Sequence, residues 1–161
     1  MPDLNPNALP YADKLRVRVC GICIKEDKLL LVRHSNTIDN KAFWAPPGGG
    51  IEFGETMHQG LKREMLEETG LQVQVCRFLF VNEYVNPPLH AVEFFFEVAV
   101  EAGEIITGTD PEVTPEKQLI EETCWLSVRE IQKLPTSDKH KSLWYLFSLD
   151  DLLGMKHNFI A

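Results

Sequence analysis

Alternation of apolar and polar residues predicts two β-strands near the start of the chain. Residues Lys14–Ile24 (KLRVRVCGICI) alternate in this way, and Leu29–Ser35 (LLLVRHS) form a second apolar run after the polar residues Lys25–Lys28. Two such runs joined by a short polar segment are typical of a β-hairpin. Residues 1–12, which precede the hairpin, are polar and proline-bearing, and we expect a loose N-terminal arm there.

Three further β-strands are predicted in the middle and later parts of the chain. Leu71–Val85 and Leu89–Glu101 are long and rich in β-branched and aromatic residues, with an Asn-Pro-Pro turn between them. Residues Ala102–Gln118 are rich in glycine, proline and acidic residues, and therefore predict a long loop. Thr123–Ser127 predicts a short strand.

Helical spacing and capping residues predict three helices. The first covers Thr56–Thr69, with a capping-box pattern at its start and a glycine after its end. The second starts after Ser127 and ends near Leu134, and the third covers about Asp138–Leu153. The elements together predict one mixed α/β domain over residues 1–161. Few β-helix-β units occur, so a regular doubly wound sheet is not expected.

Composition and charge exclude several classes of function. The 161 residues are 44 % apolar and 25 % charged, as in ordinary soluble domains, and the formal net charge is −8. A negative protein is poorly suited to bind a nucleic acid polymer or a membrane surface without specificity. The chain has no apolar run of transmembrane length, and its polar start lacks the apolar core of a signal peptide. We therefore expect a cytoplasmic protein.

The four cysteines do not form a recognisable metal site. Cys20 and Cys23 make a C-x-x-C pair, which is compatible with half of a zinc site or with a redox pair, whereas Cys76 and Cys124 are far apart. Residues three apart on a strand point to opposite faces, which disfavours binding of one ion by both thiols of the pair. We expect all four cysteines to act as small apolar residues, and disulfides are not expected in a reducing compartment.

The glycine-rich segment before the first helix raises a question about phosphate binding. From Gly49 to Thr56 the chain reads G-x-x-x-x-G-E-T, whereas a phosphate-binding P-loop reads G-x-x-x-x-G-K-[ST]. Glu55 stands at the position of the P-loop lysine, and a carboxylate there repels phosphate. An acidic site can still bind phosphate when a divalent cation lies between the two.

The helix after this segment carries three clustered glutamates, Glu64, Glu67 and Glu68. Two of them lie close to the apolar stripe of the helix at 100° per residue, where unpaired carboxylates are costly. A bound divalent cation such as Mg²⁺ offsets that cost and also bridges carboxylates to phosphates. The apolar stripe in question consists of Met57, Leu61 and Met65. The alternative to a metal site is an ordinary solvated acidic face of the helix, paired with Lys62 and Arg63.

Residues Gly49–Leu71 resemble the Nudix box, G-x5-E-x7-R-E-U-x-E-E-x-G-U, where U is a bulky aliphatic residue. Every fixed position is occupied, and the segments FWAPPGG and CWLSVREIQKL also resemble the usual flanks of the family. The resemblance implies a Nudix fold, which is an α/β/α sandwich around a mixed β-sheet with the box as a loop-helix-loop. The matching residues are Gly49, Glu55, Arg63, Glu64, Met65, Glu67, Glu68, Gly70 and Leu71.

The same resemblance implies an activity and roles for individual residues. Nudix hydrolases use Mg²⁺, sometimes Mn²⁺, to cleave the pyrophosphate linkage of a nucleoside diphosphate joined to another group. Glu64, Glu67 and Glu68 correspond to metal ligands, and the Gly49 carbonyl corresponds to a further ligand. Arg63 corresponds to a residue that orients a glutamate by ion pairing. One of the glutamates in the box helps to deprotonate water in the family, and the one matching Glu55 lies close by and assists.

Residues outside the box are weaker candidates, each with an ordinary structural alternative. Glu121 or Glu122, and less favourably Glu116, are candidates for a general base, the alternative being a surface charge. For substrate binding the candidates are Arg33 and His34 at a strand end, Trp44, Tyr84 with Asn82 and Glu83, and again Glu122. For these the alternatives are an exposed strand end, a core tryptophan and a polar strand end.

The expected partner is a small nucleoside diphosphate derivative, whose identity the sequence does not specify. Homodimers are common among proteins with this fold. A Nudix-like module that binds a nucleotide derivative without hydrolysing it is the alternative function, although a sensor has no need to keep the three glutamates together.

Overall fold

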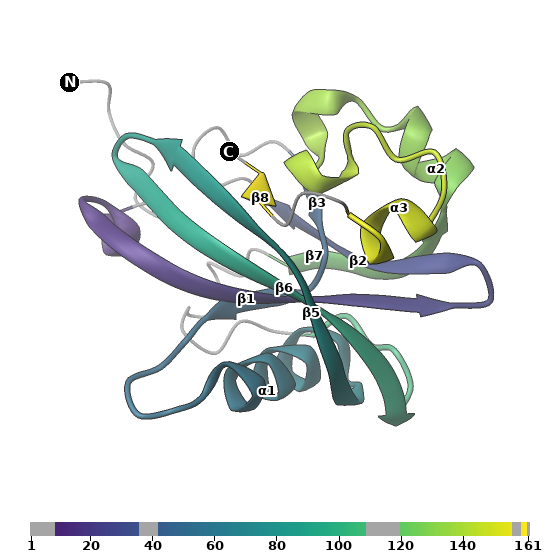
Figure 1. The fold of residues 1–161 in the computed structure, drawn as a ribbon, viewed down its shortest axis with the longest axis horizontal. Helices are drawn as coiled ribbons and strands as arrows, with labels where there is room; N and C mark the ends of the chain where they lie inside the picture. The colour runs from purple at the N-terminus through teal and green to yellow at the C-terminus, as the bar shows by residue number, and fades with distance from the viewer. Residues whose placement is uncertain (1–8, 36–41, 109–119, 156–158, 161) are drawn as a thin grey trace.

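The computed structural model describes residues 9–35, 42–108, 120–155 and 159–160, which form a bent mixed β-sheet with helices on both faces. Helix α1 covers one face, while α2, α3 and the turns around them cover the other (Figure 1). The strands are β1 (Lys14–Lys25), β2 (Lys28–Ser35), β3 (Ala42–Ala45), β4 (Gly48–Gly50), β5 (Gln72–Asn86), β6 (Leu89–Ala102), β7 (Ile120–Ser127) and β8 (Phe159–Ile160). The helices are α1 (Met57–Thr69), α2 (Val128–Lys133) and α3 (Asp150–Leu153), and 3₁₀ turns lie at Leu9–Tyr11, Thr136–Asp138 and Lys141–Leu143.

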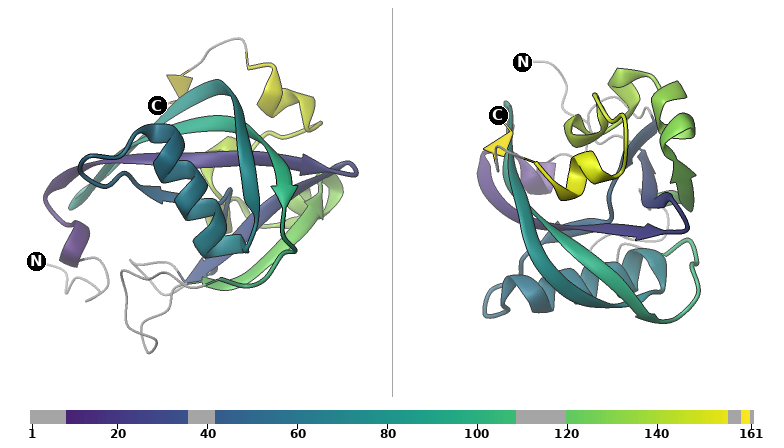
Figure 2. Two further views of the ribbon diagram at one scale, coloured as in Figure 1. Left: turned by 90° about the horizontal axis from the view of Figure 1, so that it is seen from below. Right: turned by 45° about the vertical axis from the view of Figure 1, so that its right-hand side comes forward.

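Strand β1 is the central strand and joins two parts of the sheet. Over most of its length it pairs with β6 in parallel, from Lys14 opposite Leu89 onward, and its last residues form the predicted hairpin with β2. Strands β5 and β6 form the long antiparallel hairpin that their composition predicts. Strands β3 and β7 flank β2, and the short β4 pairs with β1. The views in Figure 2 show this sheet between α1 and the C-terminal segment.

Each face of the sheet has its own apolar core. One core lies towards the C-terminal segment, where the Phe80 and Phe95 rings stack with centroids 4.5 Å apart. The other lies under α1 and contains Leu61 and Met65. Cys20 belongs to the first core and Cys23 to the second, because residues three apart on a strand face opposite ways.

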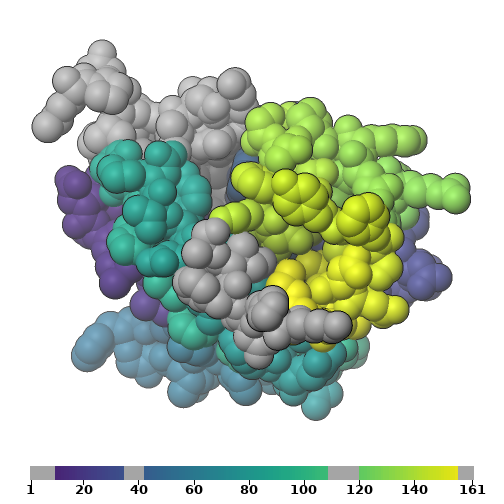
Figure 3. Space-filling model, turned by 45° about the horizontal axis from the view of Figure 1, so that its top comes forward, coloured from purple at the N-terminus to yellow at the C-terminus, as the bar shows by residue number. Residues whose placement is uncertain are grey.

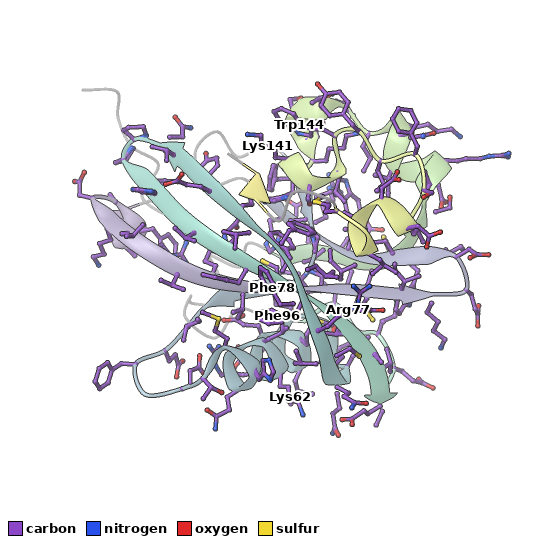
Figure 4. The ribbon with its side chains drawn as sticks, viewed as in Figure 1. Lys62, Arg77, Phe78, Phe96, Lys141 and Trp144 are labelled. Carbon is purple, nitrogen blue, oxygen red and sulfur yellow. The ribbon has the colours of Figure 1, made fainter. Side chains whose placement is uncertain are left out.

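Helix α1 begins and ends as the sequence predicts. The Thr56 hydroxyl accepts a hydrogen bond from Gln59 N while the Gln59 side chain accepts one from Thr56 N, which completes a capping box. Gly70 closes the helix with φ of 75°, a left-handed conformation that favours glycine. Figure 4 shows Lys62 on the outer side of α1 and Phe96 where the sheet covers the helix.

The predicted helix over Asp138–Leu153 is wrong, since only Asp150–Leu153 is α-helical in that segment. Lys139 is extended and forms a bridge with Trp44, and His140 N donates to Trp44 O at 2.8 Å. The His140 ring then accepts from Ser142 N, which starts a 3₁₀ turn instead of a helix. These tertiary contacts and local side-chain bonds outweigh the apolar spacing that predicts a helix.

Strands β3, β4 and β8 are not among the elements that the sequence predicts. Residues 1–8 of the predicted N-terminal arm and positions 109–118 of the predicted long loop lie outside the described residues. None of the described helices is long and apolar enough to cross a membrane.

Candidate active site

Arg63, a half-buried residue of α1, holds three carboxylates and one carbonyl in a single cluster. Its Nη2 donates to Glu55 Oε1 at 2.6 Å and to the Gly50 carbonyl at 3.0 Å. Its Nη1 donates to Glu64 Oε1 at 2.8 Å and to Glu67 Oε2 at 3.3 Å. The planar, many-donor guanidinium suits this arrangement, which a lysine cannot reproduce. The structure therefore brings Glu55, Glu64 and Glu67 together around one cation.

Two consecutive glycines bring the backbone against the helix carboxylates. Gly48 N donates to Glu68 Oε2 at 2.9 Å. A Cβ atom on Gly49 would overlap the Glu64 carboxyl group, so any side chain at this position would displace that carboxyl group. Both contacts exist because β4 pairs with β1, which places the glycine loop beside the α1 face that carries Glu64 and Glu68.

Burial and ion pairing act differently on the carboxylates. Burial raises the pKa of Glu64, although the hydrogen bond from Arg63 opposes this shift. The hydrogen bonds from Arg63 lower the pKa of Glu55, which lies nearer the solvent. The hydrogen bonds that Arg63 donates to Glu55 and Glu64 raise the pKa of Arg63 above its usual range, so the guanidinium stays charged.

The C-terminal turn of α1 is fixed by segments that follow later in the chain. Gly108 N donates to the Glu68 carbonyl at 2.9 Å, and Thr123 Oγ1 lies 3.2 Å from the same oxygen. Ile106 N donates to the Thr69 carbonyl at 2.9 Å. The last helical carbonyls therefore have partners from the loop after β6 and from β7.

The donor set of this cluster fits a hard divalent cation. It consists of carboxylate and carbonyl oxygens, which are the ligands that such ions prefer. Because Gly49 has no side chain, the Glu64 carboxyl group can lie directly against the loop backbone. Among the described residues, no group of three or more His, Cys, Asp or Glu side chains already stands at metal-binding positions. Glu55, Glu64 and Glu67 face Arg63 instead, and Glu68 faces Gly48 N.

Arg33 and Glu122, both predicted as substrate-binding candidates, lie side by side. Strands β2 and β7 pair them in register, and Arg33 Nη1 is 4.0 Å from Glu122 Oε2, while Arg33 Nε is 3.3 Å from Glu121 Oε2. His34 is the next residue along β2. Burial lowers its pKa to about 4, with help from the positive charge of Arg18, so the imidazole is neutral at pH 7.

The remaining candidates lie apart from the carboxylates. Trp44 packs in the core cluster on the side of the C-terminal segment. Tyr84 is on the surface near the end of β5, where its hydroxyl accepts a hydrogen bond from Asn86 Nδ2 at 3.1 Å. Glu116 lies outside the described residues.

A second polar cluster escaped the sequence reasoning. Glu93 and His140 are buried, and Glu93 Oε2 lies 2.8 Å from both His140 Nε2 and Asn82 Nδ2. The alternative of a polar strand end does not apply to Asn82, because Asn82 is buried inside the protein. The signal in the sequence was Glu93 itself, a single acid in the otherwise apolar run HAVEFFF.

The family model described as NUDIX domain matches residues 14–147. The chain belongs to the NUDIX family. This confirms the resemblance carried by the Nudix box, and with it the prediction of a Nudix-type enzyme and of the mixed α/β fold.

Relatives with curated names include two kinds of protein. An ADP-ribose pyrophosphatase of Methanocaldococcus jannaschii is 38 % identical over 96 residues, which are 58 % of this chain and 56 % of that protein. Phosphatase NudJ of Escherichia coli K12 is 31 % identical over 119 residues, or 73 % of this chain and 72 % of NudJ. The match with the archaeal enzyme thus spans little more than half of its length.

Solved structures share the fold. A NUDIX hydrolase from Nitrosomonas europaea has a TM-score of 0.62 at 25 % identity, covering 74 % of this chain and 76 % of that one. A UDP-X diphosphatase has a TM-score of 0.66 at 22 % identity, covering 92 % and 68 %. Nudix enzymes generally use a divalent metal ion, in agreement with the oxygen-rich cluster around Arg63.

Proposed function

We propose that this protein is a Mg²⁺-dependent Nudix hydrolase that cleaves the pyrophosphate linkage of a nucleoside diphosphate joined to another group. Mn²⁺ is the expected substitute for Mg²⁺. The observation that carries the proposal is the convergence of Glu55, Glu64 and Glu67 on Arg63 beside the glycine loop, with Glu68 held by Gly48 N. A purely structural acidic helix face would have no need for glycines pressed against its carboxylates.

In this proposal Glu64, Glu67, Glu68 and the Gly49 carbonyl hold the ion. When bound, the ion neutralises phosphate charge and lowers the pKa of water, which makes the anhydride phosphorus accessible to attack. Arg63 sets the directions of Glu64 and Glu67 through its Nη1 atom. Glu55 fixes the other side of the guanidinium and so keeps Arg63 in place.

The proposed substrate class follows from the chemistry of the site and from the relatives. A negative protein with a carboxylate cluster binds a pyrophosphate through a cation, and no serine, cysteine or histidine nucleophile is required. The names ADP-ribose pyrophosphatase and UDP-X diphosphatase both describe nucleoside diphosphates linked to a second group. We therefore place ADP-ribose and nucleotide sugars first among the substrates to test.

The test is release of a nucleoside monophosphate from a panel of compounds in the presence of Mg²⁺ or Mn²⁺. The panel comprises ADP-ribose, nucleotide sugars, NADH, dinucleoside polyphosphates, 8-oxo-dGTP and ordinary nucleoside triphosphates. We expect metal-dependent cleavage of at least one member, abolished by a chelator. Binding of a member without cleavage under any of these conditions would favour the alternative function, a nucleotide-sensing module.

A further inference from the structure

Three polar residues form a row across the sheet on the face opposite α1. Arg18 of β1 is in register with Glu93 of β6, and Glu93 is in register with Asn82 of β5. The residues two positions further along this face belong to an apolar core, including Cys20 on β1 and Phe95 on β6. The row therefore stands where apolar side chains would simply extend that core. Figure 3 shows the β5–β6 hairpin in teal and the green-to-yellow C-terminal segment as neighbours on this side of the molecule.

Glu93 is the anchor of the row. Its Oε2 accepts a hydrogen bond from Asn82 Nδ2 and lies 2.8 Å from His140 Nε2, and its Oε1 is 3.6 Å from Arg18 Nη1. His140 Nδ1 accepts from Ser142 N, so in the neutral ring Nε2 carries the proton and donates to Glu93. Burial alone would raise the pKa of Glu93, but its bond to His140 and the Arg18 charge lower it to about 2. Glu93 is therefore negatively charged at pH 7 beside Arg18.

The second terminal nitrogen of the Arg18 guanidinium, Nη2, reaches the glycine loop. Arg18 Nη2 donates to the Gly48 carbonyl at 3.1 Å, and Gly48 N donates in turn to Glu68 Oε2 at 2.9 Å. Gly48 has φ of +154°, and a Cβ there would overlap the Val19 carbonyl, so no other residue fits. Contacts thus run without a break from His140 through Glu93, Arg18 and Gly48 to Glu68.

Packing alone does not account for this chain of contacts. A buried ion pair generally adds little stability compared with well-packed apolar residues of similar size. Moreover, Arg18 Nε and Asn82 Oδ1 are buried without a hydrogen-bond partner among the described residues. The guanidinium thus leaves one donor unsatisfied while two of its other groups reach Glu93 and Gly48, so its placement favours these two contacts over complete hydrogen bonding.

We propose that Arg18 is a positioning residue for the carboxylate of Glu68, and that Glu93 and His140 hold Arg18 in the required place. The inference rests on the proposed function, because Glu68 is one of the proposed metal ligands. It links the C-terminal segment to the metal-binding loop, although the two are distant in the sequence. Arg18 itself is not assigned any contact with the substrate.

The test compares Arg18→Met with a matched variant, Arg77→Met. Arg77 also pairs with a glutamate of β6, through Arg77 Nε and Glu97 Oε2 at 2.6 Å, but it is exposed, and Figure 4 shows it beside the middle of the hairpin. The measured quantity is the Kd for Mn²⁺ without substrate, from the electron paramagnetic resonance signal of free Mn²⁺. Loss of an outer-shell partner typically weakens metal binding about 10- to 100-fold, so we expect at least a tenfold rise in Kd for Arg18→Met. Arg77→Met should match the wild type.

The sign of the change separates positioning from simple electrostatics. Removing a positive charge near a cation site by itself strengthens cation binding, because the repulsion is lost. Weaker Mn²⁺ binding by folded Arg18→Met therefore supports positioning, whereas unchanged or tighter binding overturns it. If Arg18→Met does not fold by circular dichroism, Arg18→Lys replaces it. Lysine keeps the charge, but it lacks the two separate terminal nitrogens with which Arg18 contacts Glu93 and the Gly48 carbonyl. A rise in Kd therefore supports the inference, and an unchanged Kd overturns it.

Failure of this inference is distinguishable from failure of the proposed function. Wild-type protein that binds no Mn²⁺ at millimolar concentration would overturn both. Wild-type protein that binds Mn²⁺ and cleaves a substrate, together with an Arg18 variant of equal Mn²⁺ affinity, would overturn the role of Arg18 alone.

Discussion

Arg63 Nη2 and Glu55 Oε1 lie 2.6 Å apart and close the turn that leads from the glycine loop into α1. The two residues are also the fixed arginine and first glutamate of the Nudix box. Their bond places Arg63 at the centre of the carboxylate cluster. The guanidinium also contacts Glu64 and Glu67 through Nη1, and so keeps these two carboxylates close together.

Arg63→Lys is expected to lower kcat by about 10- to 100-fold, as is usual when the partner of a metal ligand is changed. Lysine keeps the charge, but its three donors on one nitrogen cannot replace the five hydrogen bonds that Arg63 makes to Glu55, Glu64, Glu67 and Gly50. The measurement is steady-state hydrolysis of the best substrate over a range of Mg²⁺ concentrations. Lys62→Gln, on the outer side of the same helix, is the control and should retain wild-type activity. Full activity in Arg63→Lys would contradict the role assigned to the guanidinium.

Glu67→Gln and Glu68→Gln are each expected to reduce turnover by about 10²-fold or more, because charge stabilisation in the transition state is lost. Glutamine keeps the shape of the side chain but removes the negative charge that holds a hard cation. The variants should unfold at nearly the same urea concentration as the wild type. Glu101→Gln, on the surface at the end of β6, is the control for loss of one acid. Wild-type turnover in both Glu67→Gln and Glu68→Gln would rule out the metal assignment.

Gly49→Ala is expected to abolish most of the activity, because the new methyl group would overlap the Glu64 carboxyl and displace it. Gly50→Ala is a close control, since a Cβ at Gly50 would meet only the Arg16 guanidinium at an ordinary distance of 3.6 Å. Hydrolysis rates of the two variants, with thermal unfolding to check folding, provide the comparison. Equal activity of the two variants would show that the Gly49–Glu64 contact is not needed.

Local patterns predicted the parts of the fold that depend on local physics. Helix α1 follows from its capping box, its apolar stripe and Gly70, and the two hairpins follow from alternation and turn residues. The Nudix box specified the residues of the carboxylate cluster because its spacing is unusual. Strand β4 was not predictable from three glycines, which have no strand propensity, since only pairing with β1 makes them a strand.

The features that escaped prediction depend on contacts between distant segments. The row of Arg18, Glu93 and Asn82 exists because of the registers of β1, β6 and β5, and register cannot be read from each strand alone. The last predicted helix fails for a similar reason. The polar segment from Lys139 to Ser142 bonds to Trp44, Glu93 and Ile131, and these partners hold it in an extended or 3₁₀ conformation.

The stability of the protein in acid should depend on Glu93. Its pKa is about 2 in the folded protein against a usual 4.5, so the folded state binds fewer protons in this range. The resulting stabilisation is present above pH 4.5 and is lost as the pH falls from 4.5 towards 2. A difference of this size corresponds to a contribution on the order of 3 kcal/mol at pH 7.

Glu93→Gln resembles the protonated form of Glu93 and tests this contribution. The variant should be less stable than the wild type at pH 7, and the difference in free energy of unfolding should shrink as the pH falls below 4.5. Urea unfolding at several values between pH 7 and pH 3 provides the measurement. Glu97→Gln, which removes the surface partner of Arg77 on the same strand, should change stability by less than about 1 kcal/mol. A difference in free energy of unfolding between the wild type and Glu93→Gln that stays constant down to pH 3 would contradict the assigned pKa. It would mean that Glu93 has the same pKa in the folded and the unfolded protein, despite its contacts with Arg18 and His140.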